Sequence, residues 1–230
     1  MYNNSEVISY LQANKILAMK LDHAVNAVGK QVAEQVKSIG AGTTRALYYT
    51  SCFTDEYNDV CLRQKNEDIR FRDGVYRLLR HGDIGFEMLK TYFEELLKFK
   101  TAQQLEYIKK KLMTVNVHIA ASSLPNAGFA MAAASAVRMG LNLSMEISAL
   151  TGRIAGGVVG AAALYGIVQR AADSAHRLQT QYPAFYSALY VQNLEMMYFL
   201  IEPVMQRAGA LDAQWAADEN IALIITRLIR

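Results

Sequence analysis

Apolar residues recur along this chain at the spacing that is typical of α-helices. Between residues 5 and 39 they follow one another at steps of three, four or seven, and the pattern stops at Gly40 and Gly42. The sequence lacks runs that alternate apolar and polar residues with β-branched enrichment, which would indicate strands. We therefore expect an all-α fold, a bundle in which each helix buries one apolar stripe against its neighbours.

Capping residues, glycines and prolines divide the rest of the chain into further helices. Asn66 and Asp83 are expected N-caps, and Thr101 with Gln104 fits a capping box. The predicted helices cover residues 43 or 44 to about 64, 66 to 81, 83 to about 100, 101 to 124, 127 to 139, 142 to 178, 183 to about 209, and 212 to 229.

No repeat of fixed period and no Ser/Gly-rich linker interrupts these helices, so we expect one domain over residues 1–230. Its parts differ in character. Residues 1–118 form charged amphipathic helices, residues 119–182 a small-residue-rich apolar hairpin region, and residues 183–230 aromatic and Met-rich helices.

The distribution of charge sets the middle of the chain apart. Hydrophobic residues make up 52% of the sequence and charged residues 20%, which supports a large core, while a net charge of +3 is too small to predict nucleic-acid binding. All eleven lysines lie at or before Lys111. From Ile119 to Gln169 the only charged residues are Arg138, Glu146 and Arg153.

Small residues recur at every fourth position of this sparsely charged region, a pattern that lets a neighbouring helix approach closely, as in a glycine zipper. The series runs Gly128, Ala132, Ala136, Gly140, Ser144, Ser148, Gly152, Gly156 and Gly160. Each step of four overshoots a turn by about 40°, so a bend or hairpin near Gly140 is favoured over one straight helix. We expect the part from Gly140 to Gly160 to serve in helix packing or membrane insertion.

The two arms of this hairpin are only weakly suited to lipid. Residues 154–169 are uncharged, but sixteen residues of helix span about 24 Å against a hydrocarbon core of about 30 Å. Residues 119–137 are also uncharged, yet they include Pro125 and are mostly alanine in their apolar content. The pattern is that of a hairpin which a soluble bundle can hide and a membrane can accept.

Arg138, Glu146 and Arg153 follow one another at steps of eight and seven, within about 80° of one another on a continuous helix. Two interpretations are open. In the first, the charges belong to a soluble bundle, where Glu146 pairs with an arginine in the interior or the charges lie in solvent. In the second, the three charged side chains line or gate a pore.

The stretch from Pro183 to Met205 is apolar and carries only two charges, Glu195 and Glu202. The tyrosines at 182, 186 and 190, at the start of this stretch and just before it, share a helix face. This is either a core helix that exposes its hydroxyls or a helix lying at a membrane interface.

Few residues point to catalysis. The four histidines form no metal-binding spacing, so we expect no metal and no cofactor. Arg170 and His176 fit an R-x5-H pattern that resembles the motif of the HEPN ribonucleases, all-α dimeric enzymes, although Ala171 stands where that family usually has a polar residue. The resemblance implies that Arg170 steadies a phosphate and His176 acts as general acid or base.

Two further features have competing explanations. The basic residues between Arg63 and Arg80 could bind RNA phosphates, but three interleaved acids favour a solvated helix face. Cys52 and Cys61 lie nine residues apart in a segment predicted to be helical, which would place them roughly 13 Å apart, beyond the reach of a disulfide. We therefore expect two buried free thiols, with a disulfide only if the segment is a loop.

The Ala/Gly-rich hairpin within an all-α domain resembles the helical pore-forming toxins of bacteria: the colicin channel domains and the membrane-depolarising effectors that bacteria inject into rivals. The likeness is of architecture and composition over residues 119–170, and about sixty residues follow the hairpin here, unlike in colicins. It implies a non-enzymatic antibacterial toxin that inserts the hairpin and depolarises a target membrane. A helical adaptor bundle is the alternative, and a ribonuclease the second alternative.

The resemblance also implies where the protein acts and with what. We expect synthesis in the cytoplasm without a classical signal peptide, secretion by a signal-independent system, and action at the inner membrane of a target cell. The expected partners are the lipid membrane, a cognate immunity protein or chaperone, and further copies of the chain, with no nucleic acid.

Overall fold

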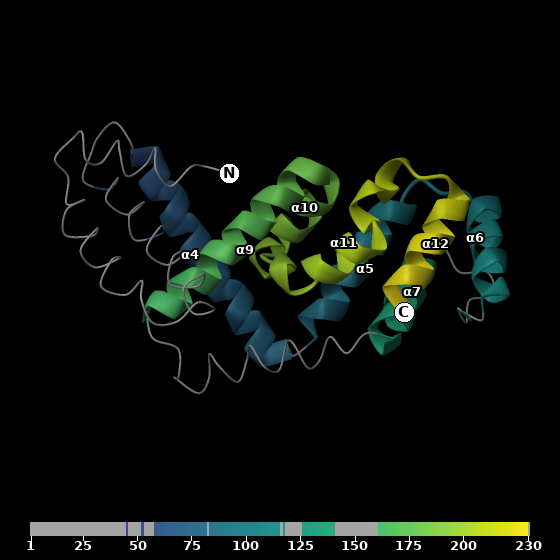
Figure 1. Ribbon diagram of the computed structural model, residues 1–230, viewed down its shortest axis with the longest axis horizontal. Coiled ribbons are helices and arrows are strands. Elements are labelled where there is room, and N and C mark those ends of the chain that lie inside the picture. Colours follow the sequence, from purple (N-terminus) through teal and green to yellow (C-terminus); the bar gives the residue numbers. More distant parts are fainter. Residues whose placement is uncertain are drawn as a thin grey trace, which may run out of the picture. The chain divides into compact units, whose positions relative to one another are not determined.

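The computed structural model describes residues 45, 52, 58–81, 83–115, 117, 126–140 and 161–229. Every regular element in these ranges is a helix (Figure 1), which confirms the predicted all-α bundle. The chain divides into two compact units, one of residues 1–68 and 159–170 and the other of residues 69–158 and 171–230. Each unit is described by itself, and the single domain stays a prediction.

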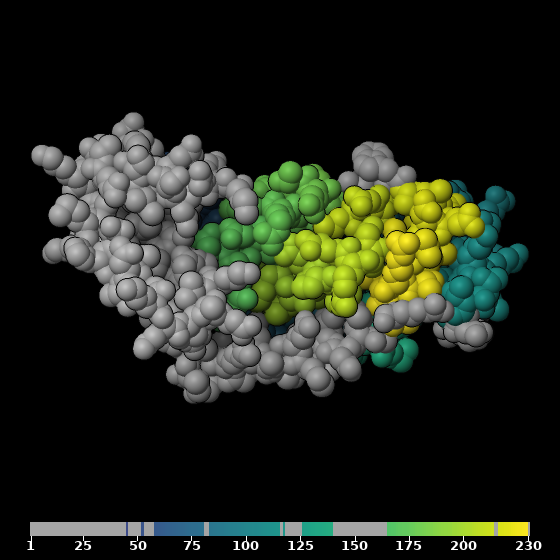
Figure 2. All heavy atoms as spheres, in the orientation of Figure 1, coloured from purple at the N-terminus to yellow at the C-terminus, as the bar shows by residue number. Residues whose placement is uncertain are grey.

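The helices are α4 (Asn58–His81), α5 (Ile84–Leu97), α6 (Ala102–Thr114), α7 (Asn126–Gly140), α9 (Ala161–Gln181), α10 (Pro183–Val191), α11 (Glu202–Ala208) and α12 (Asp218–Ile229), with the 3-10 helices η3 (Glu195–Leu200) and η4 (Ala210–Trp215). In the second unit α5 packs against α7 and α10, and α12 packs against α6, α7 and α11. Figure 2 shows α12 lying beside α6 at the surface.

The core of the second unit is built around a cluster of aromatic rings. Tyr92, Phe93, Tyr182, Phe185 and Tyr198 meet edge to face, with ring centroids between 5.1 and 6.3 Å apart. The Tyr92 hydroxyl donates a hydrogen bond of 2.8 Å to the carbonyl of Ala210. These rings join α5 to the segment after α9 through their large apolar area and their favoured tilted geometry.

Helix α4 runs without a break through Asn66, so the predicted helix boundary there is wrong. Asn66 is exposed and caps nothing. The buried positions of α4 continue past it at steps of three and four, which keeps one stripe facing inward. These buried positions are Cys61, Gln64, Glu67, Phe71, Gly74 and Leu78.

Helix α6 begins as predicted but ends ten residues early. The Thr101–Gln104 capping box is present, with each side chain hydrogen-bonded to the other residue's backbone N–H. The helix stops at Thr114, not at Leu124. The N–H groups of Val115 and Val117 both donate to the carbonyl of Leu112, and this closes the last turn before a β-branched, Asn-containing segment of low helix propensity.

The predicted single helix from residue 183 to about 209 is three helices, so that prediction is wrong in its continuity. The chain leaves α10 at Gln192, and Asn193 has a φ of 55°, in the left-handed region that Asn tolerates better than most residues. A second turn at Ile201 separates η3 from α11, which has Pro203 in its first turn. Gly209, with a φ of 67°, ends α11 where it was expected.

The segment also bends so that η3 can pack closely on α4. A β-carbon placed on Gly74 would lie 2.8 Å from Cγ of Met197. This contact explains why the helix carries glycine at a buried position, despite its low helix propensity.

Cys52 and Cys61 form a disulfide, so the prediction of two free thiols is wrong. Helix α4 starts only at Asn58, and Cys52 therefore lies outside it. The two Cα atoms are 4.9 Å apart, where a continuous helix would have kept them far beyond bonding distance.

Candidate functional site

Most of the predicted insertion site lies outside the described residues. This holds for Ser144, Ser148, Gly152, Gly156 and Gly160, and for two of the three candidate pore charges, Glu146 and Arg153. Gly140 is the last residue of α7. The first arm of the predicted hairpin is thus described as α7, and the second arm only from Ala161, where α9 begins.

Helix α7 confirms the helix predicted over residues 127–139 and packs on α5 and α12. The buried face of α7 consists of Phe129, Ala130, Ala133, Ala134 and Val137. Three members of the predicted four-residue series in α7, Gly128, Ala132 and Ala136, are only half-buried and flank this face. Small side chains on the buried face let the α5 and α7 backbones approach closely.

Arg138 is the only charged residue of α7, and it lies in solvent. Its side chain is 57% exposed and forms an ion pair of 2.7 Å with Asp83, at the start of α5. The guanidinium also lies 5.8 Å from the centroid of the Phe86 ring. Asp83 stands at the expected N-cap of α5 but makes no side-chain cap hydrogen bond, so its carboxylate serves Arg138 instead.

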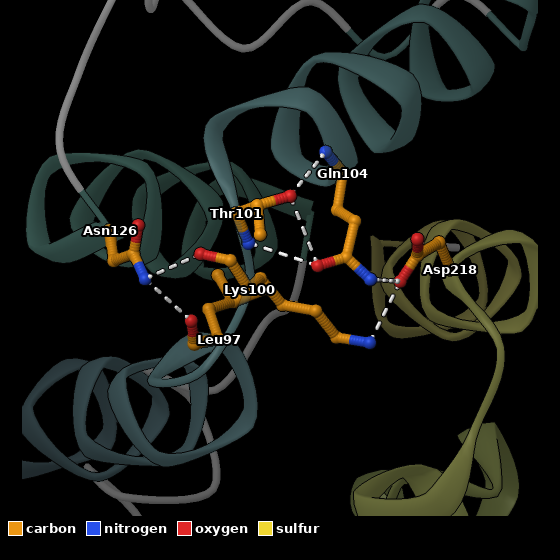
Figure 3. A network of polar contacts seen from close by, with 6 residues as sticks. All are labelled: Leu97, Lys100, Thr101, Gln104, Asn126 and Asp218. Atoms are coloured by element: carbon orange, nitrogen blue, oxygen red, sulfur yellow. Dashed lines mark hydrogen bonds and ion pairs between the residues drawn. The ribbon is translucent and has the colours of Figure 1, made fainter.

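The start of α7 is fixed by one side chain, Asn126 (Figure 3). Its Nδ2 donates to the carbonyls of Leu97, at 2.8 Å, and Lys100, at 3.0 Å, which lie where α5 ends. Lys100 in turn pairs with Asp218 of α12 at 2.7 Å. A single polar network therefore joins the ends of α5, α6, α7 and α12.

The two acids of the apolar C-terminal stretch are both buried, each against an arginine. Glu195 is 2% exposed and accepts two hydrogen bonds from Arg70 of α4. Glu202 is 8% exposed and accepts two hydrogen bonds from Arg177 of α9. Burial disfavours the Arg70 cation, but the hydrogen bond and charge of Glu195 outweigh it and raise the pKa of Arg70. A buried carboxylate requires such a partner.

Arg70 and Arg77 also hold the carbonyl end of α10. Arg70 donates a hydrogen bond to the carbonyl of Tyr190, and Arg77 donates one to the carbonyl of Gln192. Arg77 also pairs with the Glu87 carboxylate of α5. Cations at this end of a helix satisfy its free carbonyls and complement its dipole. The expected solvated face is therefore wrong for these two arginines, although Arg72 is exposed, with 72% of its side chain accessible.

The predicted tyrosine face divides between core and surface. Tyr182 is buried in the aromatic cluster, where burial raises the pKa of its phenol to about 12. Tyr190 is 39% exposed, and the Arg70 guanidinium lies over its ring, 3.5 Å from the centroid.

Arg170 and His176, the candidate ribonuclease pair, are both exposed residues of α9. Six residues of α-helix turn through 600°, so the two side chains leave the axis about 120° apart. Their catalytic role stays a prediction.

The described residues hold neither a metal-binding cluster nor a membrane-spanning helix. They contain no group of three or more His, Cys, Asp or Glu side chains that could hold a metal ion. Among the helices of the described ranges, none combines the length and apolarity needed to cross a bilayer.

Comparison of the chain with protein-family models, with curated proteins and with solved structures found no match.

Proposed function

We propose that the protein is a membrane-active antibacterial effector, which stores an apolar region in a helical bundle and inserts it into a target membrane to depolarise the cell. The region is residues 119–169, of which α7 is the described first arm. The observation that carries the proposal is the composition of α7: it has fifteen residues with one charge, and its buried face is mostly alanine.

The contrast with α12 gives this a physical scale. Burying one methyl-sized group contributes about 0.8 kcal/mol, whereas a buried Leu, Ile or Phe contributes about 1.5–3 kcal/mol. Three of the five buried side chains of α7 are alanines, while α12 buries Ile221, Ile224, Ile225 and Leu228. Release of α7 therefore costs less burial than release of α12, and lipid contacts offset much of it.

The single charge of α7 does not oppose release. The Arg138–Asp83 pair is solvent-exposed on both sides, and such pairs contribute about 0–1 kcal/mol. Once free, an arginine two residues before the end of an apolar helix can extend its charge towards the headgroups.

Ion leakage from protein-free liposomes tests the proposal. We expect the wild-type chain to release trapped ions, Gly156→Leu to reduce release because a large side chain blocks close helix approach, and Gly156→Ala to retain most of it. Intact vesicles in the presence of folded wild-type protein would count against the proposal.

A cross-link tests the part played by α7. In the variant Asp83→Cys/Arg138→Cys, both new thiols replace exposed side chains, and a flexible bis-maleimide can join them. We expect the cross-linked protein to leave vesicles sealed, and the same variant treated with a monofunctional maleimide to leak. Equal leakage by both would mean that α7 stays on α5 and that the insertion mechanism is wrong.

The same preparations distinguish the other functions. An adaptor bundle would cause no leakage and no toxicity and would form a stable complex with a helical partner. A ribonuclease would cleave RNA in a manner abolished by His176→Ala. Toxicity in a growing bacterium that depends on an added export signal would support membrane action from outside, and co-production of an immunity protein should then protect the cell.

A further inference from the structure

Two contacts tie residues 45 and 52 to the first half of α4, and all of their members belong to the first unit. The Arg45 guanidinium is fully buried. It donates to Asp68 at 2.8 Å, to Glu67 at 3.0 Å, to the carbonyl of Gln64 at 3.0 Å and to Gln169 at 3.3 Å. This is an ionic tether whose charges are satisfied on several sides.

The second tether is the Cys52–Cys61 disulfide. Cys61, Gln64 and Asp68 follow one another on α4 at steps of three and four, so they share one face of the helix. The covalent and the ionic tether therefore act on the same face.

We propose that the Cys52–Cys61 bond is a clasp that depends on the compartment. It is open, as two thiols, in the reducing cytoplasm where we expect synthesis, and it closes once the chain reaches an oxidising compartment such as the bacterial periplasm. Cytoplasmic thiol systems keep structural cysteines reduced, whereas exported proteins retain their disulfides. The Arg45 network keeps residue 45 on the same face of α4 in the open state.

The exposure of the two cysteine residues sets the order of the exchange. Cys52 is half-buried and Cys61 is 1% exposed. The Cys52 thiolate attacks the disulfide of an oxidant protein and forms a mixed disulfide, and Cys61 then attacks the Cys52 sulfur. Cys52 and Cys61 lose two electrons and two protons in total, and the oxidant leaves as a dithiol.

Closing this loop shifts the local equilibrium measurably. Cross-linking residues nine positions apart disfavours the opened chain by about a hundredfold in the loop-entropy description. In the reduced protein the ionic tether of Arg45 still opposes opening.

Thiol trapping in cells tests the compartment. The chain is produced with and without an added export signal, quenched in acid and treated with a polyethylene-glycol maleimide. We expect two modified thiols without the signal and none with it, while Cys52→Ser shows one in both cases. A bond that forms in the cytoplasm, or two thiols that persist after export, would overturn the proposal.

Hydrogen exchange of the purified protein tests the clasp itself. We expect the amides of residues 61–68 to exchange about a hundredfold faster after reduction, with α12 unchanged as an internal control. Cys52→Ser should match the reduced wild type; if that variant does not fold, wild-type protein reduced and then alkylated gives the same comparison. Equal protection of these amides in the oxidised and the reduced protein would overturn the proposal. Neither experiment reads membrane leakage, so each proposal can fail alone.

Discussion

Arg70 of α4 and Glu195 of η3 form a two-point ion pair in which Nη2 lies 2.8 Å from Oε2 and Nε donates to Oε1. The Glu195 side chain is almost fully enclosed, with 2% of it exposed, while the Arg70 side chain is 15% exposed. Loss of Arg70 would therefore leave the Glu195 carboxylate buried without a partner, which is costly.

Replacement of Arg70 by Met should lower the free energy of unfolding by about 3–5 kcal/mol, because Glu195 would stay buried without a partner. Chemical denaturation followed by circular dichroism measures the loss. Arg72→Met is the matched control on the same helix and should change stability by less than about 0.5 kcal/mol, since Arg72 is exposed. Equal losses in both variants would contradict the importance of the pair.

Tyr92 and Tyr198 should respond differently to removal of their hydroxyls. Both side chains are fully buried, but the Tyr92 hydroxyl donates to the Ala210 carbonyl, and that of Tyr198 has no hydrogen-bond partner among the described residues. Tyr92→Phe should cost about 1 kcal/mol or more, whereas Tyr198→Phe should be neutral or stabilising. Denaturation midpoints of the two variants measure this difference. A larger loss of stability in Tyr198→Phe than in Tyr92→Phe would contradict the prediction.

Stability should fall as the pH rises from about 10 to about 12. Burial raises the pKa of Tyr182 to about 12 and also raises that of Tyr92. An unfolded phenol loses its proton near pH 10, so above this pH the unfolded state binds fewer protons than the native state. The free energy of unfolding then falls by up to about 1.4 kcal/mol per pH unit for each such group. Tyr182→Phe should flatten the pH dependence measured by denaturation, and an unchanged slope would exclude its contribution.

Gly74→Ala should destabilise the protein by about 1–2 kcal/mol, although alanine is the better helix former. The added methyl would lie 2.8 Å from Met197 Cγ, too close without displacement of η3. A double-mutant cycle with Met197→Ala should show a large favourable coupling, because shortening that side chain makes room. Additive effects would mean that the clash lies elsewhere.

Amide exchange in α7 should be faster than in α12 in the absence of membranes. Helix α7 buries mainly alanines and α12 mainly isoleucines, so the local opening free energy of α7 is the smaller. Mass spectrometry of peptides covering residues 126–140 and 218–229 makes the comparison. Asn126→Ala should speed exchange in α7 further, since it removes the hydrogen bonds that fix its start.

Local signals in the sequence predicted the features that depend on local chemistry. The Thr101–Gln104 capping box, the helix over residues 127–139 and the stop at Gly209 all follow from neighbouring residues, and all are present. Asn66 was misleading because a capping residue on the exposed side of an otherwise continuous apolar stripe does not interrupt a helix.

The features that depend on distant residues were not predictable in the same way. Two acids in an apolar stretch indicate that partners must exist, but nothing local identifies Arg70 or Arg177 among the arginines of the chain. The break at Asn193 depends on packing of η3 against Gly74, and the disulfide on where α4 begins. Of the candidate insertion site, only Arg138 and α7 lie where the structure can be compared with the prediction.

The wide sequence separation of the Arg70–Glu195 pair has a consequence for biosynthesis. A ribosome that adds roughly 5–20 residues per second needs about 6–25 s to make the 125 residues that separate the two. During that time Arg70 has been made, but its acceptors, the Glu195 carboxylate and the Tyr190 carbonyl, have not. The second unit can therefore complete its core only after residue 195 has been made, and a nascent chain stalled before that residue would present an incomplete core to the chaperones of the producing cell.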